Sequence, residues 1–297
     1  MSAQRRLLSP NRWHFQHGPI DLIIQADGDQ ACVARAHEQA WGKFQDVLPT
    51  LAGELSVLRQ AVQAQANNPF NGAIARMMWE ACEPLANAFI TGHDGFITPM
   101  AAVAGSVAQS MLACYQQSGV TRAWVNNGGD IALHLTEGTS SRIGLVSDIA
   151  RAWAKVPGAQ DLLDGELHVT AQMPVRGIAT SGWRGRSHSL GIADSVTVLA
   201  MTASQADAAV TLIANAVNIS DARIVRQPAN QLRDDSDLGE RCVTVAVPSL
   251  PAHLVAQALA KGHACAQDLQ ARGLVHAALL CCQGQFEYAG QEACLAG

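Results

Sequence analysis

Short alternating apolar runs are separated along the chain by longer stretches with helical spacing. Residues 12–26, "RWHFQHGPIDLIIQA", predict two strands around a Gly-Pro turn. Residues 195–201, "SVTVLAM", have apolar side chains at every second position and predict a strand central in a sheet. Residues 136–180 are irregular with short strands. These segments indicate a protein with several sheet-forming elements.

Helical spacing fills the intervals between these strands. A helix is expected from Asp27 to about Val47, ended by Pro49, and residues 50–92 are mostly helical with a break at "NNPFNG". A helix of small residues follows, with Gly119 as the expected residue after its C-terminal end. The helix "SQADAAVTLIANAVN" comes directly after the 195–201 strand, and the polar segment 220–240 reads as an exposed excursion.

One order of elements occurs twice. Residues 111–133 and 264–289 both read as helix, glycine, strand, glycine turn and strand. This repetition suggests an internal duplication within a single domain that spans residues 1–297.

Composition narrows the class of protein. Among 297 residues, 48% are hydrophobic and 15% charged, as in a compact globule. The net charge is −5 and no cluster of Lys or Arg recurs, which argues against a nucleic-acid surface. No secretory signal or bilayer-length apolar run is visible, and the eight cysteines lack CxxC spacing, so we expect a cytoplasmic protein with reduced thiols.

The stretch "VNNGGDIALHL", residues 125–135, predicts a hairpin because Asn-Gly tolerates the positive φ of a two-residue turn. Its two glycines also leave backbone N–H groups open to a ligand, and Asp130 beside them can accept hydrogen bonds. From this stretch alone, a plain hairpin remains the favoured alternative.

A second candidate is the loop "GIATSGWRGRSHSLG", residues 177–191. Its hydroxyl groups and backbone amides would suit a phosphate, with Arg184, Arg186 and His188 as cationic or proton-transferring groups. An ordinary polar surface loop is an equally good interpretation.

The third candidate is a pair of oxygen-bearing side chains on the helix after residue 201. Asp207 and Thr211 are four residues apart and therefore lie on one face, where a carboxylate and a hydroxyl can ligate Mg²⁺. The alternative is structural, because Ser204 and Asp207 have the spacing of a capping box.

Taken in order, the three stretches resemble the ApbE-like superfamily, whose founding members are FAD:protein FMN transferases. Those enzymes show an Asn-x-Gly-Gly-Asp turn, a Thr-Ser-Gly loop followed by histidine, and an Ala-Asp-x-x-x-Thr helix. The matching residues are Asn126, Gly128, Gly129 and Asp130; Thr180, Ser181, Gly182 and His188; and Ala206, Asp207 and Thr211. The chain is closest to a short branch of the superfamily without signal peptides.

This resemblance implies a T-fold-like α+β architecture, with antiparallel sheets backed by helices and an internal duplication. It also implies a cleft that binds a flavin nucleotide, FAD or FMN, through the first two motifs. Mg²⁺ would bind at Asp207 and Thr211, His188 would be the catalytic proton acceptor, and a second partner could be an acceptor protein.

One difference from the transferases removes a positive charge that would lie near the phosphates. The transferases carry a Lys-Gly pair in the helix before the turn, where this sequence has Ala104 and Gly105. Alanine cannot replace a lysine charge near phosphate. Three hypotheses therefore stay open: a flavin-using transferase, a non-catalytic flavin- or nucleotide-binding module, and a fold-only relative with another small-molecule ligand.

Overall fold

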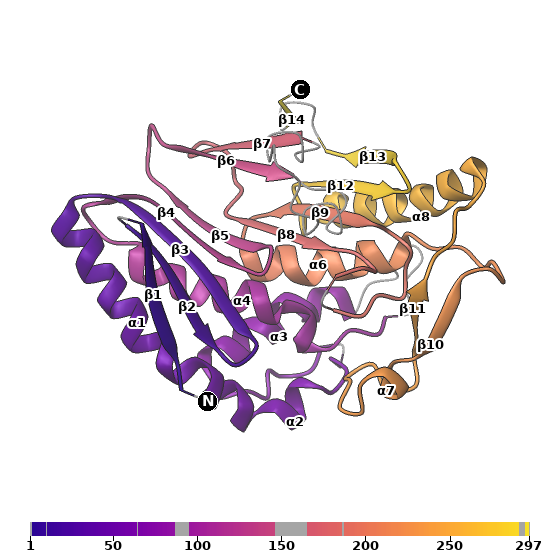
Figure 1. Cartoon of the computed structure of the whole chain (residues 1–297), viewed down its shortest axis with the longest axis horizontal. Helices are drawn as coiled ribbons and strands as arrows, with labels where there is room; N and C mark the ends of the chain where they lie inside the picture. Colours follow the sequence, from indigo (N-terminus) through magenta and orange to yellow (C-terminus); the bar gives the residue numbers. More distant parts are fainter. Residues whose placement is uncertain are drawn as a thin grey trace.

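The computed structural model describes residues 2–9, 11–63, 65–86, 95–145, 165–185, 187–290 and 295–296. A large sheet with helices on one face dominates it (Figure 1). The strand order is β1-β2-β3-β4-β5-β8-β9-β12-β13, and every neighbouring pair is antiparallel. The expected α+β class with antiparallel sheets is confirmed.

The nine strands appear in the sheet in the order of the sequence. They are β1 Gln4–Ser9, β2 Arg12–His17, β3 Ile20–Gly28, β4 Val120–Asn127, β5 Asp130–Leu135, β8 Gly177–Ser181, β9 Ser195–Ala200, β12 Ala277–Cys282 and β13 Gln285–Ala289. All six residues of β9 are buried between β8 and β12. The prediction of a central strand at this position is therefore correct.

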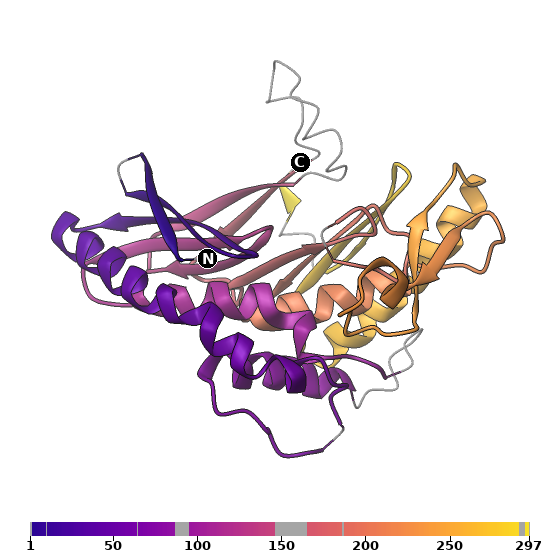
Figure 2. The same cartoon turned by 60° about the horizontal axis from the view of Figure 1, so that its bottom comes forward.

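The helices lie together beneath one face of the sheet (Figure 2). They are α1 Gln30–Gly53, α2 Leu55–Leu58, α3 Ala73–Ala86, η1 Pro99–Ala102, α4 Val103–Leu112, η2 Ala113–Tyr115, α6 Ala203–Ala216 and α8 Ala252–Ala271. Helix α6 packs against β8, β9, α3, α4 and α8. This central position explains why ten of its side chains are buried.

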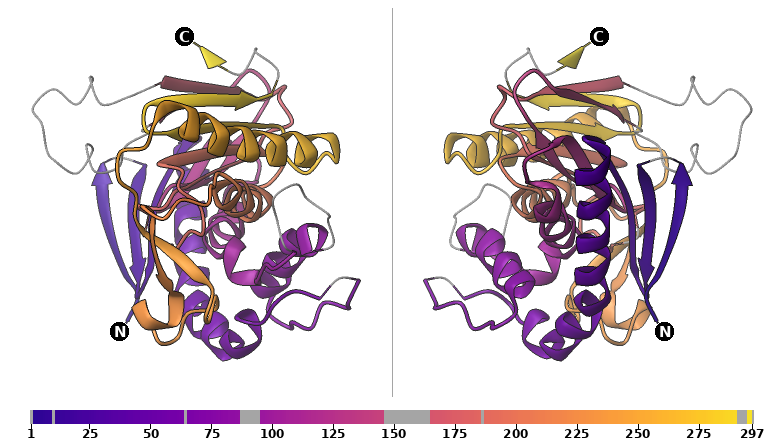
Figure 3. Two further views of the ribbon diagram at one scale, coloured as in Figure 1. Left: turned by 90° about the vertical axis from the view of Figure 1, so that its right-hand side faces the viewer. Right: turned by 90° about the vertical axis from the view of Figure 1, so that its left-hand side faces the viewer.

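A smaller sheet covers part of the opposite face, as the side views show (Figure 3). Its strands are β6 Ser140–Leu145, β7 Gly165–Thr170 and β14 Leu295–Ala296. Leu167 and Val169 of β7 pack with Leu133, Ile178 and Leu199 of the large sheet in a second apolar cluster. Alternate residues such as Ala132, Ala179 and Val198 belong instead to the cluster on the helical side, as the two-residue period of a strand requires.

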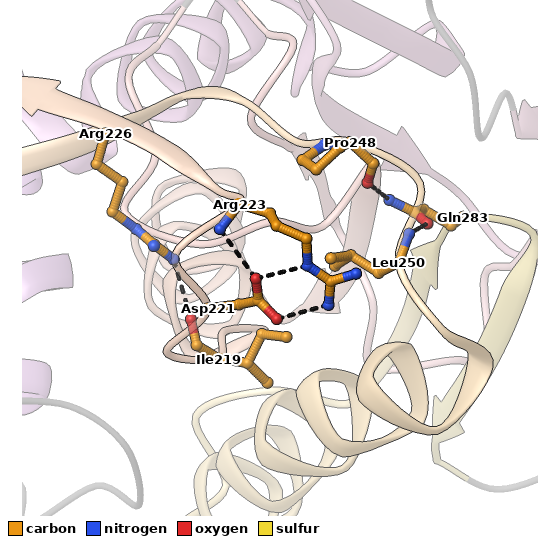
Figure 4. A network of polar contacts seen from close by, with 7 residues as sticks. All are labelled: Ile219, Asp221, Arg223, Arg226, Pro248, Leu250 and Gln283. Carbon is orange, nitrogen blue, oxygen red and sulfur yellow. Dashed lines mark hydrogen bonds and ion pairs between the residues drawn. The ribbon is translucent and has the colours of Figure 1, made fainter.

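The polar excursion forms a two-stranded ribbon at the edge of the molecule. It contains β10 Val225–Pro228, α7 Ala229–Leu232 and β11 Cys242–Ala246. Arg226 donates to the backbone oxygen of Ile219, and Arg223 makes a close ion pair with Asp221 (Figure 4). Gln283 links the following segment to the β12–β13 turn, because its side chain accepts from Leu250 N–H and donates to Pro248 O.

Two predicted helix ends are wrong. Helix α1 continues through Pro49 to Gly53, because Phe44, Val47 and Leu51 keep one apolar face buried across the proline. Helix α4 ends at Leu112, and Gly119 instead lies at φ +89° in the turn before β4. A Cβ at Gly119 would come within 2.6 Å of the Cys32 sulfur, so close packing and the positive φ explain this glycine.

The order helix, glycine, strand, turn and strand is present at both predicted places, in α4-β4-β5 and α8-β12-β13. The large sheet also divides into two groups, each with a hairpin, a long helical connection and another hairpin. These are β2-β3 to β4-β5 and β8-β9 to β12-β13. A duplication within a single domain is consistent with this order and stays a prediction.

None of the described helices is long and apolar enough to cross a membrane. The seven described cysteines are free thiols; four of them are buried and Cys242 is exposed.

Candidate functional site

The "NNGGD" motif forms the predicted turn between β4 and β5. Asn127 pairs with Asp130, and Gly128 and Gly129 between them have φ values of +68° and +119°. Both turn positions therefore favour glycine for conformational reasons alone. Gly129 N–H donates to the side-chain oxygen of Asn126 at 2.8 Å, so this amide already has a partner.

The turn is tied to two neighbouring elements by its polar side chains. The amide of Asn127 donates to the backbone oxygen of Ala104 at the start of α4, at 3.1 Å. The carboxylate of Asp130 accepts from Thr180 N–H at 3.3 Å, and Asp130 is buried. The first two sequence motifs thus meet at the β5–β8 border, where the Thr180 hydroxyl also lies 3.1 Å from that of Thr197.

Asp207 joins this group from α6. Its carboxylate accepts from Gly105 N–H at 2.8 Å, near the start of α4. Burial raises the pKa of Asp207 well above its usual range, and the negative charge of Asp130 raises it further, against the opposing backbone hydrogen bonds from Gly105 and Ala104. The two carboxyl groups are therefore close enough to repel one another in a poorly solvated environment.

The close approach of α4 and α6 depends on Gly105. A Cβ at this position would lie 2.2 Å from the backbone oxygen of Ala203 and 2.8 Å from the Asp207 Cβ. Only glycine lets the two helices meet here with their present spacing. Gly105 thus places its own N–H within reach of the Asp207 carboxylate.

Thr211 lies one turn further along α6. Its hydroxyl donates to the backbone oxygen of Asp207 at 3.2 Å, which leaves the lone pairs of the hydroxyl oxygen for another partner. Asp207 and Thr211 thus share one face of α6, as the spacing predicted. Their role as metal ligands stays a prediction.

No positive group is among the causes of the shifted pKa of Asp207. Within the described ranges, no three His, Cys, Asp or Glu side chains gather in a way that could hold a metal ion. A cation here would therefore depend on Asp207, the Thr211 hydroxyl and oxygens from a ligand or water. Mg²⁺ accepts such a mixed set of oxygens.

The loop of the second motif, after β8, is held at both ends. Gly182 packs tightly against the backbone oxygen of Asp194, where a Cβ would come within 2.2 Å. Asp194 itself accepts from the Trp183 indole and from Gln283 N–H. Ser181 is half-buried at the end of β8.

His188 is exposed, and the loop after it is fastened to the other end of α6. The Ser189 hydroxyl and Leu190 N–H both donate to the side-chain oxygen of Asn215, at 3.1 and 2.9 Å. No direct contact joins His188 to Asp130 or Asp207 among the described residues, and Arg186 lies outside them. The structure therefore brings together the turn, Thr180 and Asp207, with His188 in a loop that is attached near the other end of α6.

The alternative capping role of Ser204 and Asp207 is wrong. Thr202 caps α6, since its hydroxyl accepts from Gln205 N–H at 3.3 Å, while Ser204 bonds to Gln109 of α4. Thr202 lies directly before the helix in a β conformation, and threonine is a preferred N-cap residue. The sequence therefore allowed the cap to be placed at Thr202, two residues before Ser204.

The sequence interpretation missed two further contacts. Asn215 lies four residues after Thr211, as Thr211 does after Asp207. This spacing could have indicated that all three residues share one face of the helix. The hydrogen bond from the Thr98 hydroxyl to Asp237 joins residues 139 apart, and no local pattern indicates it.

The all-antiparallel sheet, with helices on one face and an acidic site beside them, places the chain among α+β proteins. The profile of a family described as "AbpE bacteria" matches residues 5–288. The chain belongs to this family. The resemblance noted in the sequence is thereby confirmed.

Curated relatives match over part of their length. A UPF0280 protein from Methanothermobacter thermautotrophicus is 36% identical over 148 residues, which cover 47% of this chain and 50% of the relative. A UPF0280 protein from Methanoregula boonei is 31% identical over 183 residues, covering 60% and 71%. The chain spans about half the length of the first relatives that it matches.

A solved structure shares the fold. A mutant of the flavin transferase ApbE from Vibrio cholerae superposes with a TM-score of 0.50 at 11% identity, over 98% of both chains. At this identity the similarity shows the fold alone.

Proposed function

We propose that this protein binds a flavin dinucleotide together with Mg²⁺ at the Asp130–Asp207 site. The observation that supports the proposal is the position of the Asp207 carboxylate, which accepts from Gly105 N–H beside the buried Asp130. Burial and then the charge of Asp130 raise the pKa of Asp207 there. A divalent cation bound there would relieve the repulsion between the two carboxylates, and phosphate oxygens would complete its ligand set.

The residues present fit such a group. Asp207 and Thr211 would hold the cation, while Asn126, Gly128, Gly129, Asp130, Thr180, Ser181 and Gly182 would form the wall against the flavin nucleotide. Bound there, Mg²⁺ would withdraw charge from the pyrophosphate. Gly105 N–H keeps the Asp207 carboxylate in place from the other side.

The finer proposal is an FMN transfer in which His188 is the catalytic residue. The acceptor hydroxyl would give its proton to His188 and form a bond to the FMN phosphorus, while the phosphoanhydride bond breaks and AMP leaves. His188 is exposed, and an imidazole nitrogen can accept the proton of an attacking hydroxyl. The acceptor would be a threonine-bearing protein, and the protein would work in the cytoplasm.

A binding module without transfer is the second candidate. Ala104 favours it, because the half-buried start of α4 carries no cationic side chain where the transferases have lysine. Less neutralisation of the leaving phosphate slows phosphoryl transfer.

Calorimetric titration with FAD and Mg²⁺ tests the shared part of both candidates. We expect Mg²⁺-dependent binding by the wild type and loss of it in Asp207→Ala. Asp268→Ala is the matched control, since Asp268 forms only a surface pair with Arg272. No affinity for any flavin would contradict the proposal.

Incubation with FAD, Mg²⁺ and a threonine peptide separates the two candidates. Flavinylated peptide that disappears in His188→Ala would support the transferase and contradict the binding module. Measurable FAD affinity with no product would support the module.

A further inference from the structure

The accessible side of α6 is a polar stripe. Apart from Gln205, only Asp207, Thr211 and Asn215 of this helix are not buried, and these three follow at four-residue spacing. Residues four apart lie above one another on a helix, so the stripe runs for two turns, about 12 Å. Asp207 and Thr211 belong to the site proposed above, and Asn215 extends the same face by one turn.

The orientation of the Asn215 amide is fixed by its partners. Leu190 N–H can only donate, and it points at Asn215 at 2.9 Å, so the side-chain oxygen must face the loop. The Ser189 hydroxyl donates to the same oxygen. The NH₂ group of Asn215 therefore points away from Ser189 and Leu190.

This NH₂ group is available to a ligand. It has no hydrogen-bond partner in the described part of the chain, and it is not among the buried polar atoms that lack one there, so water reaches it. A side-chain amide offers two donors, which suit the oxygens of a phosphate. It carries no charge, so it would not form an ion pair with Asp207 at the other end of the stripe.

We propose that Asn215 is a further ligand-binding residue, whose NH₂ group donates to a phosphate oxygen of the nucleotide held at Asp207 and Thr211. This rests on the proposed function for the identity of the ligand, but the anion contact itself needs only a phosphate. In this arrangement the two ends of one amide serve two purposes, because the oxygen holds the segment after His188 and the nitrogens hold the ligand. A neutral donor at this place partly offsets the lysine that Ala104 replaces.

Asn215→Asp is the decisive variant. It keeps an acceptor oxygen for Ser189 and Leu190 and replaces the NH₂ group with a second oxygen that repels phosphate. Gln205→Glu is the matched control, because it makes the same amide-to-carboxylate change on the same helix, away from the stripe. Ser189→Ala removes two hydrogen bonds of the loop, to the Asn215 oxygen and from Gly191 N–H, while leaving the Asn215 nitrogen untouched.

The probes are FAD and inorganic pyrophosphate, each with Mg²⁺, titrated calorimetrically into the full chain. We expect Asn215→Asp to weaken both at least tenfold, with Gln205→Glu and Ser189→Ala within threefold of wild type. The thermal midpoints of Asn215→Asp and Gln205→Glu should be unchanged, whereas that of Ser189→Ala should fall because Gly191 N–H loses its partner. Wild-type-like affinity of Asn215→Asp for both probes would overturn the proposal and leave the proposed function standing.

The titration with pyrophosphate distinguishes the flavin-binding function from the phosphate contact of Asn215. Wild-type binding of pyrophosphate but not FAD, again lost in Asn215→Asp, would overturn the flavin function and support the anion contact. If the wild type binds neither probe, both proposals are overturned.

Discussion

Two pairs of poorly solvated polar groups, one within the helical layer and one between β5 and α6, differ in their chemistry. In the first, His37 of α1 and Tyr115 of η2 are joined by a 2.8 Å hydrogen bond, with their rings edge to face. In the second, Asp130 and Asp207 are both acids, and the charge of one raises the pKa of the other. The first pair is joined by its own hydrogen bond, whereas the two charges of the second repel one another.

The difference separates a structural role from a functional one. A buried donor and acceptor that satisfy each other stabilise a core, and nothing further is required of them. Two poorly solvated carboxyl groups that repel one another destabilise the fold that contains them unless something binds. The His37–Tyr115 pair therefore serves the fold, and under the proposed function the Asp130–Asp207 pair would serve a ligand.

The largest expected effect is on FAD affinity, when one charge of the acid pair is removed. Asp207→Asn keeps an acceptor for Gly105 N–H and removes the like charge, so we expect unchanged or higher stability without ligand and at least a hundredfold loss of FAD affinity. Tyr115→Phe should do the reverse, costing about 1–3 kcal/mol because His37 loses its partner, with FAD affinity unchanged. Urea unfolding and calorimetry measure both quantities. A destabilised Asp207→Asn would show that the acid pair is structural after all.

The second prediction tests the helix contact that supports the acid pair. Gly105→Ala places a Cβ 2.2 Å from the Ala203 oxygen, which forces α4 away from α6. Overpacking of this kind costs about 3 kcal/mol and should also weaken FAD binding, because the Gly105 N–H moves from Asp207. Gly42→Ala, with open space around its Cβ, is the control in urea unfolding. Equal stability of the two variants would contradict the prediction.

The third prediction concerns pH and the His37–Tyr115 pair. Burial lowers the pKa of His37 from 6.5 to about 4. The unfolded chain therefore takes up the proton first as pH falls, so stability decreases between pH 6.5 and 4. We expect a loss of about 2 kcal/mol over this range in urea unfolding, discounted for partial solvation. His37→Gln should flatten this part of the profile, and an identical slope in the variant would refute the assignment to His37.

The smallest expected effect tests whether the turn glycines serve conformation alone. Gly129→Ala has open space for its Cβ but must keep φ at +119°, which costs about 1 kcal/mol. If a ligand also approaches this backbone, FAD affinity should fall beyond what the stability loss explains. Unchanged affinity would assign Gly129 to the turn only. Thermal unfolding and calorimetry on one preparation decide the matter.

The sequence predicted those parts of the molecule that local pattern determines. Alternation gave β9 and the β2–β3 hairpin, and the Asn-Gly pair gave the β4–β5 turn. It erred at Pro49 and Gly119, where packing of Phe44, Val47 and Leu51, or of Cys32, outweighs the local signal.

For the site, spacing placed Asp207 and Thr211 on one face of a helix. It could not show that Asp207 faces Gly105 of another helix or that Asp130 lies beside it, since these contacts join residues 102 and 77 positions apart. Such contacts exist only after the sheet has brought β5 and β8 together.

That border has a mechanical consequence. Between β5 and β8, only Ile131 with Ile178 and Ala132 with Gly177 are paired in register, the shortest ladder in the large sheet. The bond from Thr180 to Asp130 and the contact of Asp207 with Gly105 cross the same seam, one in the sheet and one in the helical layer. A ligand bound to these groups would connect the two groups of strands across this border. Ligand binding should therefore slow amide hydrogen exchange at residues 177–180.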